Sequence, residues 1–286
     1  MGNEPVQPKV QPQPSLEAAS PYEMRVHLGE GVPETDVRSA LKTGDLGFLH
    51  SFKTGSAVDG PGIRLVAWTT SCMFRCRYCH NPDTWTLSNG IPVSLEQAID
   101  ELRKYAPGLK AMNGGFTLSG GEPLMQDRFA IRLLAAAKDM GIHTAIETNG
   151  FYADNLSDAE LRLIDLVILD MKAFEPAQHE RVTGIRDNRP VLEFGRRLAA
   201  LGRPMWLRYV LVPGLTDDPI EMAKVAGYGA SLGVVERAEI LPFHQLGEYK
   251  WKKLGLDYRL AATEPPSVEA VDDAIALFRA AGLAAC

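Results

Sequence analysis

Short apolar segments alternate with amphipathic helical patterns along most of this 286-residue chain, and this alternation constrains the fold more than any other feature. Each apolar segment is bounded by residues that break regular structure, which is typical of buried strands. Several of the helical patterns end at a glycine suited to a helix C-cap. Because strands that alternate with helices pair in parallel, the sequence predicts an α/β fold with helices outside the sheet. About six such units indicate an open or partial parallel barrel rather than a closed one of eight.

The expected elements follow directly from this pattern. Strands are predicted at 63–70, 115–119, 142–147, 166–171, 205–212 and 238–243. Helices are predicted at 95–105, 129–140, 158–164, 191–201, 220–232 and 268–281. Ser94 and Gln97 have the spacing of a capping box at the first of these helices. Residues 248–266 show no clear period and are expected to form a loop over one rim of the barrel.

The N-terminal segment differs in composition from the remainder of the chain. Residues 1–45 are rich in Pro, Gln, Glu and Ser and have few large apolar side chains, so we predict a mostly disordered tail. A short helix at 35–42 is compatible with the sequence, and order is expected to begin near residues 45–50. Residues 46–286 are predicted to form the core domain.

Charge and hydropathy bear on several classes of partner and on location. The formal net charge of −6 argues against a nucleic-acid binder, which would usually carry a basic surplus. The N-terminal segment lacks the apolar core of a signal peptide, and no apolar run reaches the roughly 18 residues that a membrane span needs. Three of the four cysteines lie close together, which is unlike a secreted disulfide framework. We therefore expect a cytoplasmic protein with no membrane partner, and a monomer.

The three clustered cysteines are Cys72, Cys76 and Cys79, in the segment SCMFRCRYCH at 71–80. The fourth cysteine, Cys286, is given no role. Three buried cysteines on so short and polar a loop would be unusual. A zinc site completed by His80 is one alternative, since three sulfurs and one imidazole make a closed tetrahedral site. An iron–sulfur cluster explains the number three better, because a cubane usually takes four cysteines, one for each iron. Three ligands leave one iron with an open position, as catalytic metal centres do.

The chemically unusual residues all follow the predicted strands. After or within the six strands come SCMFRCRYCH, SGGEP at 119–123, ETNG at 147–150, DMK at 170–172, Arg208 with VPG at 212–214, and PFH at 242–244. The carboxyl ends of parallel strands share one rim, and sites in such barrels are built there. The sequence therefore predicts one composite site.

In combination, these motifs carry a specific resemblance. The CxxxCxxC loop with a downstream GGEP resembles the radical S-adenosylmethionine enzymes. Within them, the motifs are similar to those of the pyruvate formate-lyase activating enzymes: DGPGIR at 59–64, YCHNPDTW at 78–85, SGGEP, ETNGF at 147–151, LDMK at 169–172, WLRYVLVPG at 206–214 and LPFHQLG at 241–247. The resemblance extends from about residue 47 to the last predicted helix and leaves the N-terminal segment out.

The resemblance implies a radical SAM core, a [4Fe–4S] cluster and S-adenosylmethionine. In that family the open iron binds the methionine amine and carboxylate, and the reduced cluster cleaves the sulfonium. The resulting 5′-deoxyadenosyl radical removes a hydrogen from a glycine Cα in a loop of the partner, pyruvate formate-lyase. A low-potential reductant such as flavodoxin is the usual electron source. The cofactors carry this chemistry while the protein supplies orientation.

The same resemblance assigns roles to individual residues. Cys72, Cys76 and Cys79 would ligate the cluster. The contacts with S-adenosylmethionine would be made by Tyr78, Cys79, His80, Gly120, Gly121, Asp170, Met171, Lys172 and His244. The catalytic set would also include Arg208, facing the nascent radical or substrate loop, and Asp59, meeting the glycine loop of the partner.

Several of these residues also have plainer interpretations. Gly120 and Gly121 let a backbone approach a ligand closely, yet an ordinary turn would use the same residues. Asp170 and Lys172 could form a rim salt bridge of little energetic value. A lone histidine such as His244 after a strand is more often structural.

One position departs from the family pattern. Glu147 stands where the family usually has Asp, which together with the following Thr helps to bind a monovalent cation. Glu147 keeps a carboxylate oxygen of the type that hard cations prefer, so with Thr148 it is assigned to such a site. Replacement of Glu147 by Ala would then weaken stimulation by potassium or sodium.

Three alternative functions remain open from the sequence. An activase of a different glycyl-radical enzyme is the nearest, although many of those contain a cysteine-rich ferredoxin module for which this chain has no spare cysteines. A radical enzyme acting on a small molecule is less compatible with the substrate-facing motifs. A zinc-stabilised binding module would be colourless, whereas an iron–sulfur protein purified anaerobically would be brown.

Overall fold

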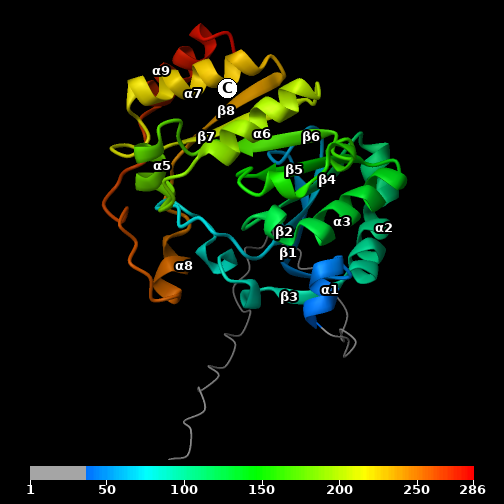
Figure 1. Ribbon diagram of the computed structural model, residues 1–286. Helices are drawn as coiled ribbons and strands as arrows, with labels where there is room; N and C mark the ends of the chain where they lie inside the picture. Colours follow the sequence, from blue (N-terminus) through cyan, green and yellow to red (C-terminus); the bar gives the residue numbers. More distant parts are fainter. Residues whose placement is uncertain (1–36) are drawn as a thin grey trace, which may run out of the picture.

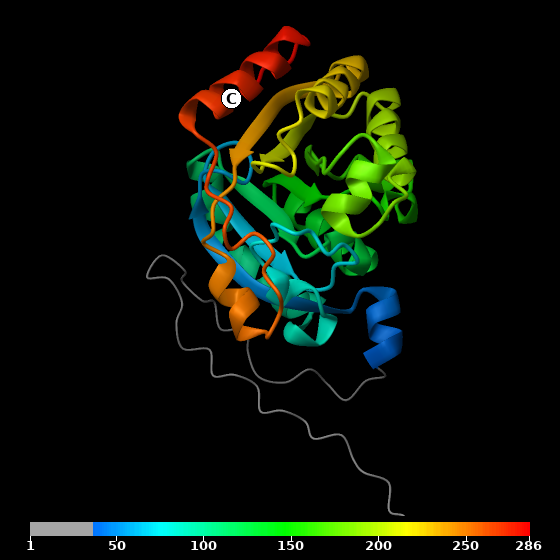
Figure 2. The same cartoon turned by 90° about the vertical axis from the view of Figure 1, so that its left-hand side faces the viewer.

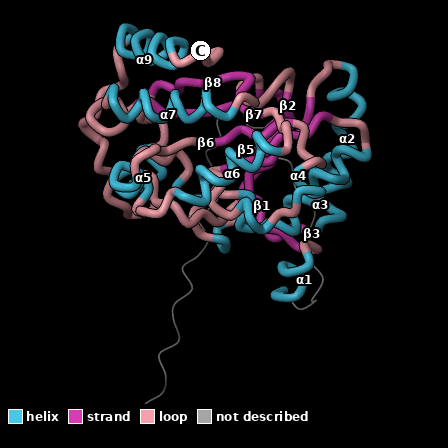
Figure 3. The backbone as a smooth tube through the Cα atoms, turned by 45° about the horizontal axis from the view of Figure 1, so that its top comes forward, coloured by secondary structure: helices cyan, strands magenta, loops and turns pink. Residues whose placement is uncertain are grey.

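The computed structural model describes residues 37–286, and eight strands in this part of the chain form one sheet in the order β3-β1-β2-β4-β5-β6-β7-β8 (Figure 1). Because β3 and β8 are its two edges and do not pair, the sheet stays open. Figure 3 shows the strands curving inside an outer layer of helices. The α/β, open-barrel fold predicted from the alternation is confirmed.

The parallel part of the sheet consists of the six predicted strands. They are β2 (Arg64–Thr69), β4 (Gly115–Gly120), β5 (His143–Thr148), β6 (Leu166–Asp170), β7 (Met205–Leu211) and β8 (Val235–Pro242). Each pairs in parallel with the next in this order. Their carboxyl ends therefore lie along one edge, which is the geometry that a composite site requires.

Two antiparallel strands extend the sheet beyond the prediction. β1 (Leu46–Ser56) pairs antiparallel with β2, and β3 (Ile91–Ser94) pairs antiparallel with β1. The register of β1 shifts twice against β2, so its side chains do not follow a simple alternation between buried and exposed. This irregularity explains why the sequence pattern missed β1.

Most helices lie close to where the sequence placed them. They are α2 (Leu95–Ala111), α3 (Asp127–Asp139), α4 (Asp158–Leu161), α6 (Arg189–Ala200), α7 (Pro219–Leu232) and α9 (Val268–Ala280). The capping box of Ser94 and Gln97 is present at the start of α2. α2 continues to Ala111 rather than ending at 105, because it accommodates Pro107 within its last turns.

Of the three remaining helices, two were not expected. α5 (Pro176–Thr183) was missed, and α8 (Glu248–Lys253) lies in the segment predicted to be a loop. α1 (Val37–Thr43) lies near the short helix considered at 35–42 and packs against α3 and β1, so order begins before residue 45. The rest of the predicted tail, residues 1–36, lies outside the described residues.

Apolar packing forms two layers that matter for the site. The larger cluster joins residues of the sheet to residues of the outer helices, and it includes Leu118, Phe129, Leu169 and Leu207. A second cluster, which includes Phe74, Phe243 and Trp251, lies around the loop that follows β2.

The final residues of the chain run beside β8, where Cys286 forms backbone hydrogen bonds with Ala238 and Ile240. Figure 2 shows α9 beside this strand. From residue 37 onward, no helix has the length and apolar character to cross a membrane.

Candidate active site

A cavity of about 440 Å³ opens at the carboxyl ends of the parallel strands. Its walls contain every residue that the sequence assigned to the site, with the exception of Met171. The lining assigned residues are Asp59, Cys72, Cys76, Tyr78, Cys79, His80, Gly120, Gly121, Glu147, Thr148, Asp170, Lys172, Arg208 and His244. The predicted gathering of strand-end residues into one place is thus what the fold produces.

Met171 lies elsewhere. Its side chain is fully buried in the larger apolar cluster, and its backbone N–H donates to the carbonyl of Arg208 at 2.9 Å. Asp170 and Lys172 face the cavity on either side of it, as the alternation of side chains along an extended chain requires. The position of Met171 supports a packing role, and contact with a cofactor stays an unsupported prediction.

The loop after β2 carries the three cysteines, none of which forms a disulfide. Its backbone is fixed from outside: Arg75 N–H donates to the carbonyl of Thr183 at 2.8 Å, and Arg77 N–H donates to that of Val182 at 3.0 Å. On the other side, Trp251 Nε1 donates to the carbonyl of Cys79 at 2.8 Å. These bonds hold the three sulfur-bearing residues at one wall of the cavity.

Burial is the main influence on the cysteine thiols. It raises the pKa of Cys72 and Cys79 above the ordinary value and that of Cys76 to about 12, where the nearby Lys172 acts in the opposite direction. Three thiolates are therefore costly here without a positive group beside them. An iron–sulfur cluster supplies that charge, so this donor set fits the group that the sequence implies.

Asp170 and Lys172 form the best-defined polar pair of the cavity. Lys172 Nζ donates to Asp170 Oδ2 and lies 5.2 Å from the ring centre of Tyr78. Although burial opposes the charge on Lys172, the neighbouring Asp170 raises its pKa well above the usual value. The other oxygen, Asp170 Oδ1, is buried without a hydrogen-bond partner. An acceptor of this kind fits a hydroxyl or ammonium donor from a bound molecule, such as a ribose.

His80 and His244 lie against each other at the rim. Their rings stack with centres 4.0 Å apart, and His80 Nε2 donates to the carbonyl of His244 at 3.0 Å. Burial, and then repulsion by His244, lowers the pKa of His80 to about 4. A zinc site would need the His80 imidazole as its fourth ligand; with Nε2 engaged in this bond, zinc would have to bind at Nδ1.

The two glycines after β4 are required by neighbouring backbone. Gly120 has φ +128°, and a Cβ there would lie 2.2 Å from the Thr69 nitrogen. A Cβ on Gly121 would lie 2.4 Å from the Ser71 carbonyl oxygen. The chain at the end of β4 passes so close to the chain at the end of β2 that both positions need glycine. This packing explains the two glycines without any contact to the methionine amine.

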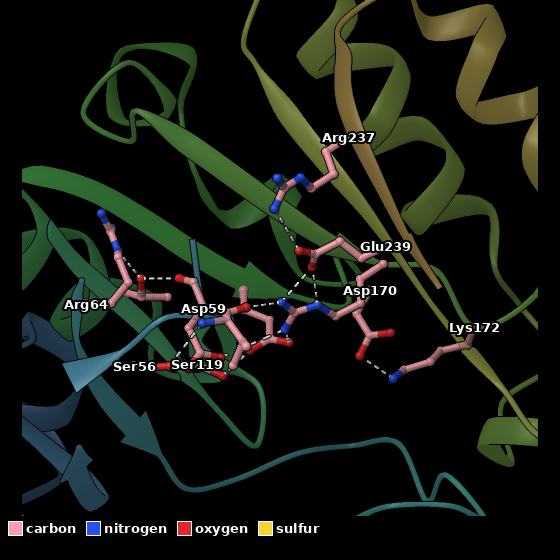
Figure 4. A network of polar contacts seen from close by, with 12 residues as sticks. Ser56, Asp59, Arg64, Ser119, Asp170, Lys172, Arg237 and Glu239 are labelled. Carbon is pink, nitrogen blue, oxygen red and sulfur yellow. Dashed lines mark hydrogen bonds and ion pairs between the residues drawn. The ribbon is translucent and has the colours of Figure 1, made fainter. Parts of the chain in front are cut away.

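Arg208 on β7 is the centre of a buried ionic network (Figure 4). Its guanidinium donates to Glu147 and to Glu239, with Nη2 2.8 Å from Glu239 Oε2, and to the carbonyl of Val58 at 2.7 Å. Asp59 lies 4.0 Å away. Burial acts against the charge of Arg208, but the surrounding carboxylates raise its pKa above the usual value. Figure 4 shows this network of polar contacts, with Asp59, Ser119 and Glu239 among its labelled members.

Glu147 and Thr148, assigned from the sequence to a monovalent cation, have protein partners here. Glu147 accepts hydrogen bonds from Ser119 and Arg208, which keep the pKa of its carboxyl low although burial acts to raise it. The Thr148 hydroxyl donates to Glu122 at 2.6 Å. Arg208 thus already balances the Glu147 charge, and the cation assignment stays a prediction.

The loop that carries Asp59 is held in place by hydrogen bonds from Ser56 and Thr117. Ser56 donates to the Asp59 carboxylate, while the Thr117 hydroxyl donates to the Asp59 carbonyl at 2.6 Å. Fully buried Arg64 donates to Thr117 at 2.9 Å and so supports that hydroxyl. Burial, followed by repulsion from Glu147, raises the pKa of Asp59.

Sequence reasoning missed two acidic residues of the site. Glu122 is fully buried and accepts from Thr148, from Leu124 N–H and from Asn149 N–H, which joins the ends of β4 and β5. Its signal was present, since it is the acidic residue of the quoted SGGEP. Glu239 pairs with Arg208 from β8, and a charge within a predicted apolar strand was the signal available for it.

The comparisons with known proteins agree with this geometry. Residues 66–226 match the family model of the radical SAM superfamily. The pyruvate formate-lyase-activating enzyme of Staphylococcus epidermidis is 43% identical over 235 residues, which cover 80% of this chain and 93% of the relative. This chain belongs to the radical SAM superfamily and, within it, to the pyruvate formate-lyase-activating enzymes.

Two solved structures share the fold. A domain of the pyruvate-formate lyase-activating enzyme from Bacteroides vulgatus has 27% identity and a TM-score of 0.51, and the match covers 60% of this chain and 98% of that domain. SuiB of Streptococcus suis, bound to the precursor peptide SuiA, has 14% identity and a TM-score of 0.57 over 77% of this chain and 47% of SuiB. The second likeness concerns the fold alone. Membership of the superfamily implies a [4Fe–4S] cluster and S-adenosylmethionine as cofactors.

Proposed function

We propose that this chain activates pyruvate formate-lyase by creating a glycyl radical in a loop of that enzyme. The observation that carries the proposal is the single cavity that joins the three cysteines to Asp170, Lys172 and Arg208. The activity named for relatives that are 43% and 41% identical supports the choice of partner. An activase of another glycyl-radical enzyme is less favoured, because those relatives carry the pyruvate formate-lyase name.

The residues that would face the cofactors have separate roles. Cys72, Cys76 and Cys79 would hold the cluster. When bound, the cluster and S-adenosylmethionine supply one-electron cleavage of the sulfonium and the radical that takes hydrogen from a glycine Cα. Asp170 Oδ1, which needs a donor, would bind a ribose hydroxyl, and Lys172 would stay positive to hold the methionine carboxylate. Burial among Tyr78 and its neighbours excludes water from this side.

Asp59 and Arg208 line the same cavity and would face the partner. Arg208 fixes the loop of Val58 and Asp59 through the Val58 carbonyl, so the loop is positioned by the same network that lines the cavity. Val58, which lines the cavity, is 67% exposed and would provide apolar surface for an incoming peptide loop. Asp59, with its raised pKa, would offer a hydrogen bond to the backbone of that loop.

The decisive assay combines reduced, cluster-loaded protein with S-adenosylmethionine and pyruvate formate-lyase. We expect a glycyl-radical signal in electron paramagnetic resonance and an equal amount of 5′-deoxyadenosine. Cleavage of S-adenosylmethionine without a radical on that partner would refute the substrate assignment while leaving the cofactor chemistry in place. Cys76→Ala is the negative control, and it should lose both products.

The remaining assignments have narrower support. A low-potential reductant such as flavodoxin, a monomeric state and a cytoplasmic location are proposed; the four unpaired cysteines favour a reducing compartment. A monovalent cation at Glu147 and Thr148 would have to bind to Glu147 while this residue also pairs with Arg208. Loss of potassium or sodium stimulation in Glu147→Ala would support that site, and unchanged dependence would refute it.

A further inference from the structure

A second cavity, of about 340 Å³, lies behind the cysteine loop, on the far side from the cofactor residues. Its walls include four arginines, Arg75, Arg77, Arg181 and Arg259, against two acidic residues. We call this feature the arginine groove. Since the chain as a whole has a net charge of −6, this concentration of positive charge runs against the overall balance.

Of the four arginines, only Arg259 has an acidic partner in the described part of the chain. Arg75, Arg77 and Arg181 have no carboxylate within ion-pair distance among residues 37–286. Of the two acidic residues, Glu180 pairs outward with Arg186 at 2.9 Å, and Asp257 lies 3.4 Å from Arg259. Instead, Arg75 and Arg181 donate to backbone carbonyls, of Cys72 and Gly214 respectively, which fixes their positions without cancelling their charges. The groove therefore presents a preorganised positive surface.

The groove shares a wall with the cofactor cavity. Arg75 and Arg77 alternate with Cys76 along one loop, so that the arginines line one side and the cysteines line the other. Trp85 borders both cavities, and Trp251, which binds the Cys79 carbonyl, borders the groove. A molecule bound in the groove would be separated from the cluster position by little more than the thickness of this loop.

We propose that the arginine groove is the docking surface for an acidic one-electron carrier protein. The inference rests on the proposed function, because a cluster held by Cys72, Cys76 and Cys79 must receive an electron from outside. The cofactor cavity is reserved for S-adenosylmethionine and the partner loop, which leaves the outer face of the loop as the electron entrance. One electron passes from the carrier to the cluster, so that the carrier is oxidised by one electron and the cluster is reduced by one electron. No bond forms and no proton moves.

The test uses the full chain loaded with its cluster, a bacterial flavodoxin as the acidic carrier and photoreduced deazaflavin as a small reductant. In Arg181→Glu/Arg259→Glu, we expect the Kd for oxidised flavodoxin to rise about tenfold or more at low salt. Reduction of the cluster by reduced flavodoxin, followed by absorbance, should slow to a similar extent. The wild-type rate should fall steeply with salt and the variant rate only weakly. Reduction by deazaflavin should be unchanged.

The control, Arg103→Glu/Arg162→Glu, alters the net charge equally on exposed arginines of α2 and the end of α4. It should leave flavodoxin binding within about twofold of the wild type. The milder Arg181→Gln/Arg259→Gln guards against misfolding and should give an intermediate Kd.

Four outcomes would overturn the proposal. They are unchanged flavodoxin binding in both groove variants, an equal loss in the control, an equal slowing with deazaflavin, and loss of pyruvate formate-lyase binding with normal reduction by flavodoxin. Wild-type protein that flavodoxin reduces normally but that makes no glycyl radical would refute the proposed function and leave the docking surface intact.

Discussion

Arg208 shows how one residue can link the two sides of the site. A single guanidinium binds Glu147 and Glu239, while Asp59 lies just beyond hydrogen-bond distance. Charges this deeply buried are stable only together, because loss of one partner leaves the others without compensation. The planar guanidinium of Arg208 also fixes the positions of its partners, because separate nitrogens donate to Glu147 and to the Val58 carbonyl.

Lysine at position 208 should therefore disable the site. Arg208→Lys keeps the charge but cannot bind Glu147, Glu239 and the Val58 carbonyl at once. We expect formation of the glycyl radical to fall at least about tenfold, and Arg208→Met to cost about 3–5 kcal/mol of unfolding free energy, measured in urea.

Arg237→Lys is the matched control for this prediction. Arg237 also approaches Glu239, at 3.6 Å, but its side chain is 47% exposed, so the change should cost less than about 0.5 kcal/mol. Equal effects at positions 208 and 237 would contradict the central role of Arg208.

His143 gives a pH-dependent prediction away from the site. Its Nδ1 lies 3.2 Å from Arg64 Nη1, which can only donate, so the imidazole must be neutral. Burial and then the charge of Arg64 lower its pKa from 6.5. Since the unfolded chain then binds a proton that the folded chain refuses, stability falls as pH drops below about 6.5.

His143→Gln should remove part of that pH dependence, because its amide oxygen can accept from Arg64 without titrating. The comparison is the unfolding free energy in urea at pH 7 and pH 5 for the variant and the wild type. A wild-type decline that is no steeper than that of the variant would show that His143 does not contribute.

At the level of residues, the sequence indicated which groups would meet but not how they would pair. The cysteines, Asp170 and Lys172 follow strands whose ends share one rim, so topology alone brings them together. The pairing of Glu147 with Arg208 depends on the register between strands: Arg208 lies opposite Asp170 on β6 and Glu239 on β8. No local pattern in the sequence carries that register.

At the level of elements, the missed segments are those that tertiary contacts stabilise. β1 is irregular because its register shifts, and β3 has only four residues, at the edge of the sheet. α8 has six residues, too few for a stable isolated helix, and its sequence EYKWKK shows no amphipathic period. Its contacts explain its presence: Trp251 binds the Cys79 carbonyl, and Lys250 binds Asn81 and Asp83.

α8 should therefore matter for retention of the cluster more than for folding. Trp251→Phe keeps an aromatic ring beside Trp85 but removes the N–H that binds the Cys79 carbonyl. We expect a stability loss of about 1–2 kcal/mol and a several-fold faster release of iron to a chelator, followed by absorbance.

Trp206→Phe serves as the comparison for Trp251→Phe. Trp206 is 8% exposed against 6% for Trp251, but it packs in a separate apolar cluster with Leu166 and Ile168. Its replacement should leave iron release unchanged. If both variants released iron at the same rate, general loosening of the fold rather than the α8 contact would be responsible.

At the scale of the molecule, the parallel part of one sheet brings together residues that lie far apart in the sequence. Its carboxyl edge gathers the cofactor residues, and the single loop after β2 divides the cofactor cavity from the arginine groove. Alternation of strands and helices was sufficient to predict the edge. The groove was not predictable: α5, which carries Arg181, was not expected, and no pattern in the sequence indicated that the loop after α8 would bring Arg259 to the cysteine loop.

The division of the chain at residue 45 can be tested by two truncations. Removal of residues 1–36 leaves every described contact in place, so we expect its unfolding free energy in urea to stay within about 0.5 kcal/mol of the full chain. Removal of residues 1–45 also deletes α1 and Gly44, where a Cβ would lie 2.5 Å from the Arg128 backbone, and the Asp45 carbonyl that accepts from Leu95 N–H at 2.9 Å. This close packing should make the longer truncation less stable by about 1–3 kcal/mol.

Arg132→Gln separates packing from charge in that comparison. The Arg132–Asp45 ion pair is 44% and 59% exposed, so its loss alone should cost less than about 1 kcal/mol. If Arg132→Gln were as unstable as the longer truncation, the ion pair would account for the whole effect. If instead both truncations were equally stable, the core domain would begin at residue 46 as the composition predicted, and α1 would be an addition that the fold does not need.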